Sequence, residues 1–136
     1  MTLTLTDVFS GLAAVLQSGA GLTVIKGYPD WARTTASLPL GALELAAQAP
    51  VYASRLGQHA ARREVAFRVY VFARHELELC DLLDAMQAFT DQQARFELND
   101  QRVDLRLQSA ERYTPEASVQ QERHAFVYQY STTWSA

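Results

Sequence analysis

The sequence predicts an α+β fold, with a mostly antiparallel sheet of four to five strands and two helices on one face. Residues 64–92 change from alternating apolar positions, typical of a strand, to the spacing of an amphipathic helix. A second amphipathic segment opens the chain, and further alternating segments follow the central one. The expected element order is α-β-β-β-α-β-β, in which both helices can cover the same face of the sheet.

The first part of the chain predicts one helix and two strands. Thr6 or Asp7 can cap a helix whose apolar residues recur at helical spacing, and a glycine pair can end it. The short run 22–25 is rich in β-branched residues and predicts a strand. Residues 38–46 are apolar but contain Pro39, which cannot donate a ladder hydrogen bond, so we expect an edge or outer strand there.

Residues 47–63 lose all periodicity and predict either a protruding arm or a hairpin. The segment is locally basic, which indicates solvated surface or an electrostatic contact with an acidic neighbour. Interfaces favour Trp, Tyr and Arg, although an aromatic residue near a loop can equally fill a local core. The candidate contact residues of this part of the chain are Trp31, Tyr52, Arg55, His59, Arg62 and Arg63.

The central strand, expected at residues 64–73, spans roughly 33 Å. Such a length exceeds what a small core requires, so we expect another subunit to cover it. The following helix has an apolar stripe at Leu79, Leu82, Leu83, Met86 and Phe89. Its opposite face includes Asp81 and Asp84, which predict a solvated face, with an acidic contact surface as the alternative.

Three residues early in the central helix could in principle carry chemistry. His75 and Glu78 share a helix face and could ligate a metal, but no third ligand is identifiable, so helix capping explains them better. Cys80 is the only cysteine and is expected to be a small core or half-buried thiol. No motif for nucleophilic catalysis or phosphate binding is present. We therefore expect no enzyme, no metal and no cofactor.

The last third of the chain predicts two strands after the central helix. Asn99 and Asp100 form a turn signal between residues 96–98 and residues 102–107, and the latter alternate between apolar and charged. Residues 119–134 predict a very long final strand. One of its faces is aromatic and could stack bases, but without interleaved basic residues we expect packing in the core or between subunits. That face consists of Phe126, Tyr128, Tyr130 and Trp134.

Composition narrows the possible classes of protein. A length of 136 residues predicts a single domain covering 1–136. A net charge of −3 gives no reason to expect specific nucleic-acid binding or attachment to an anionic membrane. The first residues lack the basic and apolar segments of a signal peptide, and no apolar run approaches membrane-spanning length.

Five segments together carry a family resemblance: VFSGLAAVL (8–16), LTVIKGYPD (22–30), LPLGALEL (38–45), VAFRVYVFARHELELCDLLDAM (65–86) and RHAFVYQYSTTW (123–134). In order and pattern they resemble the tail terminator proteins of long-tailed bacteriophages, which include the lambda minor tail protein U and related tail-completion proteins. The likeness covers most of the chain.

This resemblance implies a structural virion protein of the tail and neck region, assembled in the cytoplasm of the bacterial host. Such proteins form a hexameric ring that caps the finished tail tube, ends tube polymerisation and joins the head-neck connector. The implied partners are identical subunits, the tube protein and the connector or stopper protein, with DNA passing through the ring. The alternatives are a head-completion or neck protein, or a small-ligand or peptide-binding module.

Overall fold

The structure is a computed structural model that describes residues 3–46, 51–54, 61–92, 94–114 and 120–135, with the backbone alone for 51–54, 61 and 62. Its helical elements are α1 (Leu5–Ala20), α2 (Glu76–Gln92) and the short 3₁₀ helix η1 (Gln120–Glu122). The strands are β1 (Val24–Lys26), β2 (Leu40–Leu45), β3 (Val51–Ser54), β4 (Ala61–Ala73), β5 (Arg95–Leu98), β6 (Gln101–Arg112) and β7 (His124–Ser135).

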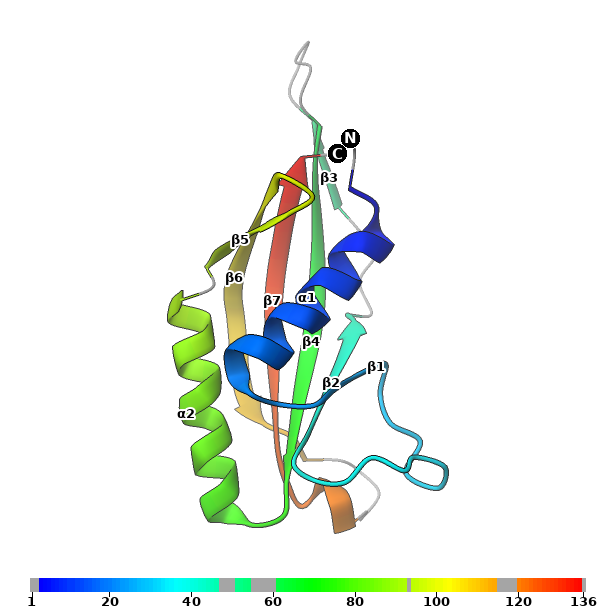
Figure 1. The fold of residues 1–136 in the computed structure, drawn as a ribbon, viewed down its shortest axis with the longest axis vertical. Coiled ribbons are helices and arrows are strands. Elements are labelled where there is room, and N and C mark those ends of the chain that lie inside the picture. Colours follow the sequence, from blue (N-terminus) through cyan, green and yellow to red (C-terminus); the bar gives the residue numbers. More distant parts are fainter. Residues whose placement is uncertain (1–2, 47–50, 55–60, 93, 115–119, 136) are drawn as a thin grey trace.

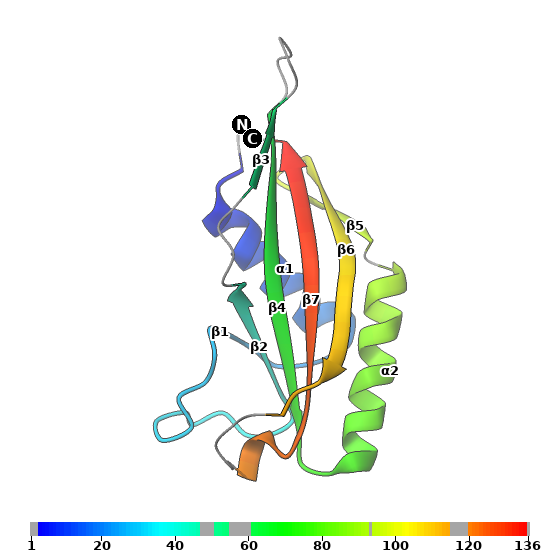
Figure 2. The same ribbon diagram turned by 180° about the vertical axis from the view of Figure 1, so that it is seen from behind.

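The described strands form one seven-stranded sheet in the order β1-β2-β4-β7-β6-β5, with β3 pairing to the beginning of β4. Only β1 and β2 pair in parallel, so the sheet is mostly antiparallel. Both long helices lie on one face (Figure 1), and the opposite view has no helix in front of the central strands (Figure 2). The α+β class is confirmed, but the number and order of the strands differ from the prediction.

The additional strands are β3 and β5, each of four residues. Strands this short complete only two alternations, so periodicity hardly reveals them. Part of the predicted arm at 47–63 is thus the hairpin β3–β4, while 47–50 and 55–60 lie outside the described residues. The segment 38–46 is not the edge strand, because β1 pairs outside β2 and Pro39 precedes the first ladder residue.

Helix α1 begins two or three residues earlier than the sequence predicted. Thr4 is the N-cap: its Oγ1 accepts a hydrogen bond from Asp7 N at 3.1 Å, and the Asp7 carboxylate accepts one from Thr4 N at 3.0 Å. This reciprocal capping box requires the two side chains at a spacing of three residues. The prediction of Thr6 or Asp7 as cap was wrong, whereas the glycine end is confirmed by Gly21 at φ 64°.

The main core lies between the two helices and the sheet. The apolar stripe of α2 is buried at Leu79, Leu82, Met86 and Phe89, with Leu83 packed against the cluster. The aromatic face of β7 packs in this core, as predicted, and its polar tips have partners there. Tyr130 Oη lies 2.8 Å from Thr90 Oγ1, and Trp134 Nε1 donates to the Leu3 carbonyl oxygen at 3.2 Å.

Two further expectations are corrected. Cys80 is exposed, because it lies about 100° around the helix from the buried Leu79. The final strand begins at His124 rather than at 119, because η1 occupies 120–122 and residues 115–119 lie outside the described part.

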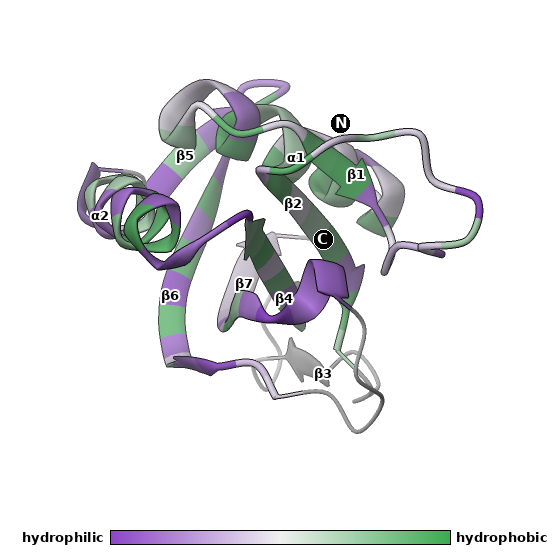
Figure 3. Cartoon of the chain, turned by 90° about the horizontal axis from the view of Figure 1, so that it is seen from below, coloured by the Kyte–Doolittle hydropathy of each residue, from purple (hydrophilic) through white to green (hydrophobic). Residues whose placement is uncertain are grey.

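The expectation that another subunit covers the central strand is also wrong for the helix face of β4. Val65, Phe67, Val69 and Val71 are at most 2% exposed within the chain itself. The strand that stays uncovered is β6, where every residue from 106 to 112 is exposed. End-on, β6 curves away from the hydrophobic centre with alternating hydrophilic and hydrophobic bands (Figure 3).

A bulge in β6 decides which of its later side chains face α2. Leu107 pairs with Tyr130 but Ser109 pairs with Gln129, so Gln108 is an extra residue that shifts the alternation by one. Ala110 and Arg112 therefore lie on the helix face. Without the bulge, Glu111 would occupy the helix face at this end of the strand.

Gly41 provides a test of the packing between α1, β1 and β2. A Cβ at this position would lie 2.7 Å from Leu22 Cδ2, and Leu22 is only 3% exposed, so it has little room to move. We expect Gly41→Ala to lower the free energy of unfolding by about 1–3 kcal/mol in urea denaturation. The control Gly19→Ala, at an exposed helical position, should stabilise by about 0.4–1 kcal/mol. Equal stability of the two variants would contradict this packing.

Candidate functional site

The candidate contact residues fall into three separate places. Tyr52 and Arg63 are register partners in the β3–β4 hairpin, where Arg62 pairs with Ala53. Of these side chains the structure describes only Arg63, and Arg55 and His59 lie outside the described residues. The hairpin is therefore the one place where the fold brings several predicted contact residues together.

Arg63 belongs to the fold as well as to the surface. Its guanidinium carbon lies 5.3 Å from the centre of the Trp134 ring, a cation–π contact with a fully buried indole. The long aliphatic part of an arginine covers apolar surface in such an arrangement. Arg63 thus packs against a residue of the main core. The prediction of a purely solvated charge did not include this contact.

Asp81 and Asp84 lie on the outer face of α2 and are exposed, as expected for a solvated helix face. The helix and the β3–β4 hairpin lie toward opposite ends of the molecule (Figure 1). The acidic helix face and the basic hairpin therefore do not meet within one chain.

Trp31 fills a local core on the face of the sheet away from the helices. Its ring packs edge-on against Phe72 with centroids 4.9 Å apart, in a second cluster that also contains Tyr70 and Ala125. Its indole Nε1 donates to Glu122 Oε1 at 2.7 Å. Of the two roles considered for Trp31, the structure shows the local core.

Glu122 is the centre of this arrangement, and sequence reasoning missed it. The carboxylate is 4% exposed and accepts hydrogen bonds from both Trp31 and the hydroxyl of Tyr28. Tyr28 also reaches Tyr113 Oη at 3.2 Å. Burial, and then the bond to Glu122, raise the pKa of Tyr28, so it remains a donor. Its partners lie about ninety residues apart in sequence, so no local signal could have revealed the site.

A shallow hollow of about 220 Å³ adjoins this cluster on the same face. Its lining is mostly polar: Arg68, Tyr70, Ser109, Glu111, Tyr113, Val127 and Gln129. Glu44 fixes two of these side chains, accepting from Tyr70 Oη at 2.8 Å and from Arg68 Nη1 at 3.2 Å. Burial, followed by the bond to Glu44, raises the pKa of Tyr70 to about 12.

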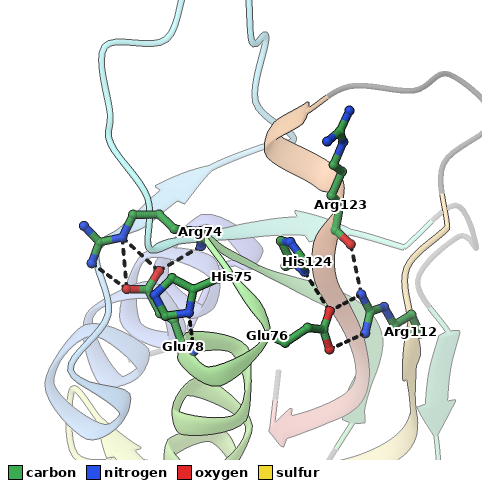
Figure 4. Close-up of polar contacts among 7 residues, drawn as sticks. All are labelled: Arg74, His75, Glu76, Glu78, Arg112, Arg123 and His124. Atoms are coloured by element: carbon green, nitrogen blue, oxygen red, sulfur yellow. Dashed lines mark hydrogen bonds and ion pairs between the residues drawn. The ribbon is translucent and has the colours of Figure 1, made fainter.

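The start of α2 carries a group of polar contacts (Figure 4). His75 precedes the helix, and its Nδ1 accepts a hydrogen bond from Glu78 N at 3.2 Å. The Glu78 carboxylate accepts from Arg74 N at 2.8 Å and from the Arg74 guanidinium at 2.5–3.2 Å. These bonds lower the pKa of Glu78 to about 2. The capping interpretation of His75 and Glu78 is confirmed.

Glu76 connects the same helix end to the sheet. Arg112 binds its carboxylate through two bonds of 2.6 and 3.0 Å, and His124 Nδ1 lies 2.6 Å from Oε1. These contacts, with that to Arg112 the largest, lower the pKa of Glu76 to about 2. Glu76 and Glu78 are consequently ionised at neutral pH and serve as anchors for cations. The β6 bulge makes this possible, because it directs Arg112 rather than Glu111 toward α2.

Among the described residues, no three His, Cys, Asp or Glu side chains gather in a way that could hold a metal ion. None of the helices described is long and apolar enough to cross a membrane.

Replacing Glu122 tests its role as the hydrogen-bond acceptor of Tyr28 and Trp31. Glu122→Ala removes the acceptor for both donors, so we expect the free energy of unfolding to fall by about 1–3 kcal/mol. Glu122→Gln keeps an acceptor oxygen and should lose less, as should Trp31→Phe, which removes one donor. Urea denaturation monitored by tryptophan fluorescence measures all three. If Glu122→Ala unfolds with the free energy of the wild type, the hydrogen bonds of Tyr28 and Trp31 to Glu122 do not stabilise the fold.

The anchoring of Glu76 predicts a loss of stability in acid. Because its pKa is about 2 in the folded chain and 4.5 ordinarily, its contribution is complete above pH 4.5 and is lost as pH falls toward 2. Glu76→Gln should therefore lower the urea midpoint at pH 6 but scarcely at pH 2. Arg112→Met should have the same pH dependence, and the double variant should lose less than the two single losses added together. Strict additivity would contradict a direct pair.

Comparison with protein-family models gave no match, and comparison with curated proteins gave none either.

Proposed function

We propose that this protein is a structural virion protein, a tail terminator, that forms a ring on the completed tail tube of a long-tailed bacteriophage. The ring ends polymerisation of the tube protein and provides the joint to the head-neck connector. Each subunit contributes surfaces for contact with its neighbours, and no step of this role requires a catalytic group.

The observation that carries the proposal is the uncovered outer strand. Over residues 106–112 the structure pairs β6 with β7 alone, and all seven of these residues are exposed. An open strand edge presents unpaired backbone groups and invites pairing with another chain. A subunit of an assembly is expected to have such a surface.

The arrangement of elements also supports the proposal. The segments that carry the resemblance to tail terminators form α1, the β4–α2 unit and β7. The segment 47–63, for which the sequence predicted an arm or a hairpin, contains the β3–β4 pairing, which extends β4 beyond its pairing with β2. A ring uses two different surfaces of each subunit, and the basic hairpin and acidic α2 face are two such surfaces, set apart in the molecule.

The alternatives have less support. A ligand-binding module built on the aromatic row would need Tyr128 and Tyr130 accessible, and they are 6% and 0% exposed. The hollow beside Tyr70, at about 220 Å³, is smaller than the roughly 300–1,000 Å³ of ordinary ligand pockets. A head-completion or neck protein is the other structural virion protein considered, and the component that the protein binds separates it from a tail terminator.

Mass measurement and imaging test the proposal. We expect light scattering to give six times the chain mass of 15.2 kDa for the protein alone, or an added mass of that size on each purified tail tube that has bound it. Negative-stain images should show a ring on one end of each tube, and capped tubes should not grow when tube protein is added. Binding to head connectors but not to tubes would identify a neck protein instead. A monomer under every condition, with tubes left uncapped, would refute the ring.

A further inference from the structure

The hollow beside Tyr70 is formed by the register of three strands on the sheet face away from the helices. Its lining includes two neighbouring rows of paired residues from β4, β7 and β6: Arg68, Gln129 and Ser109 in one row, and Tyr70, Val127 and Glu111 in the next. Tyr113 closes the lining one row further along β6. Val127 and Ser109 have shorter side chains than their neighbours, so the rows leave a depression of about 220 Å³.

The bulge in β6 gives this hollow its carboxylate. Because Gln108 is an extra residue, Ser109 and Glu111 lie on the face away from the helices. Without the bulge, Ala110 would pair with Val127 in the second row, and the lining would contain no carboxylate.

Glu111 is the charged residue of the lining whose charge is not compensated. Arg68 already has a partner, since its Nη1 lies 3.2 Å from Glu44 Oε1, which also accepts from Tyr70 Oη. Among the described residues, the carboxylate of Glu111 has no hydrogen-bond or ion-pair partner. Glu111 and Arg68 lie on the two outer strands of the hollow and in different rows, with Cα atoms roughly 12 Å apart. The surroundings of Glu111 therefore favour a cation.

The uncharged groups of the lining suit a flat cation with several donors. Ser109 and Gln129 each have a side-chain oxygen that accepts no hydrogen bond from the described residues. The rings of Tyr70 and Tyr113 also line the hollow, with centroids 5.1 Å apart. A guanidinium has five N–H donors in one plane, binds a carboxylate through two of them and packs against aromatic rings, whereas an ammonium is a compact, strongly hydrated charge.

We propose that this hollow binds the guanidinium of an arginine side chain presented by a partner protein. Glu111 accepts two of its hydrogen bonds, Gln129 and Ser109 accept from the remaining N–H groups, and the tyrosine rings pack against the flat group. A volume of about 220 Å³ is below the roughly 300–1,000 Å³ of ordinary ligand pockets, so the hollow suits one side chain rather than a larger molecule. The site lies within one chain and does not depend on the proposed ring.

Amino acids capped at both ends test the site on the isolated protein. N-acetyl-arginine methylamide presents the side chain without charged termini, and the corresponding citrulline compound is its neutral analogue of the same shape. Saturation-transfer NMR should give a saturable signal with the arginine compound and none with the citrulline compound. The lysine compound should bind more weakly, because its ammonium lacks the planar set of donors.

Three results of this experiment would overturn the proposal. Equal binding of the arginine and citrulline compounds would show that charge plays no part. Equal binding of the lysine compound would remove the preference for a guanidinium. Binding of N-acetyl-glutamate methylamide in place of the arginine compound would show that the hollow takes an anion through Arg68.

Matched variants locate the binding. Glu111→Gln should weaken binding of the arginine compound about three- to tenfold. Ser109→Phe fills the hollow from an exposed position and should abolish binding. The control Glu97→Gln removes an exposed carboxylate outside the hollow and should bind as the wild type does. Circular dichroism should be the same for all four proteins, and wild-type binding by either hollow variant would overturn the site.

Assembly of Ser109→Phe identifies the protein that supplies the arginine. A smaller mass than the wild type in light scattering would support a second copy as the source. An unchanged mass with loss of binding to purified tail tubes or connectors would support that component as the source. Wild-type mass together with wild-type binding to both would overturn a role for the hollow in binding a partner and leave the proposed ring intact.

Discussion

The pairing of β4 with β7 is the constraint on which the rest of the structure depends. The two strands pair from Arg62–Ser135 to Ala73–His124, along nearly their whole lengths. The apolar residues that α1 and α2 cover lie on one face of this ladder, and Tyr70 and Phe72 lie on the other face. Because neighbouring strands attach to either side of this pair, its register fixes which side chain meets which across the sheet.

The two faces of that ladder are stabilised differently. The helix face is a continuous apolar core, in which Tyr130 and Trp134 find partners for their polar atoms. The other face is closed at one end by an aromatic group that a buried carboxylate, Glu122, holds in position. Burying a charge is costly unless it is hydrogen-bonded, so the donors on Tyr28 and Trp31 are what make this arrangement stable.

The bulge at Gln108 connects stability with the proposed assembly. It places Arg112 where Glu76 anchors the first turn of α2, and it sets the direction of the backbone donors along the outer edge of β6. An open edge of this kind fits the proposed role in an assembly, since its backbone groups are left without a strand partner in the described chain.

The sequence by itself determined the fold class, the buried stripe of α2, the aromatic face of the last strand and the capping of α2 by His75, because each depends on spacing within one segment. It offered the β3–β4 hairpin only as an alternative to an arm, and it marked the turn after residues 96–98 without counting β5 as a strand. It did not reveal the Thr4 cap or the exposure of Cys80. Of the candidate contact residues, it placed Asp81 and Asp84 correctly on a solvated face. Only the tertiary structure decided that Trp31 packs against Phe72, that Glu122 is buried, and that Leu45 and Leu107 end one row of paired residues. Those facts depend on register between strands far apart in the chain, which no local periodicity contains.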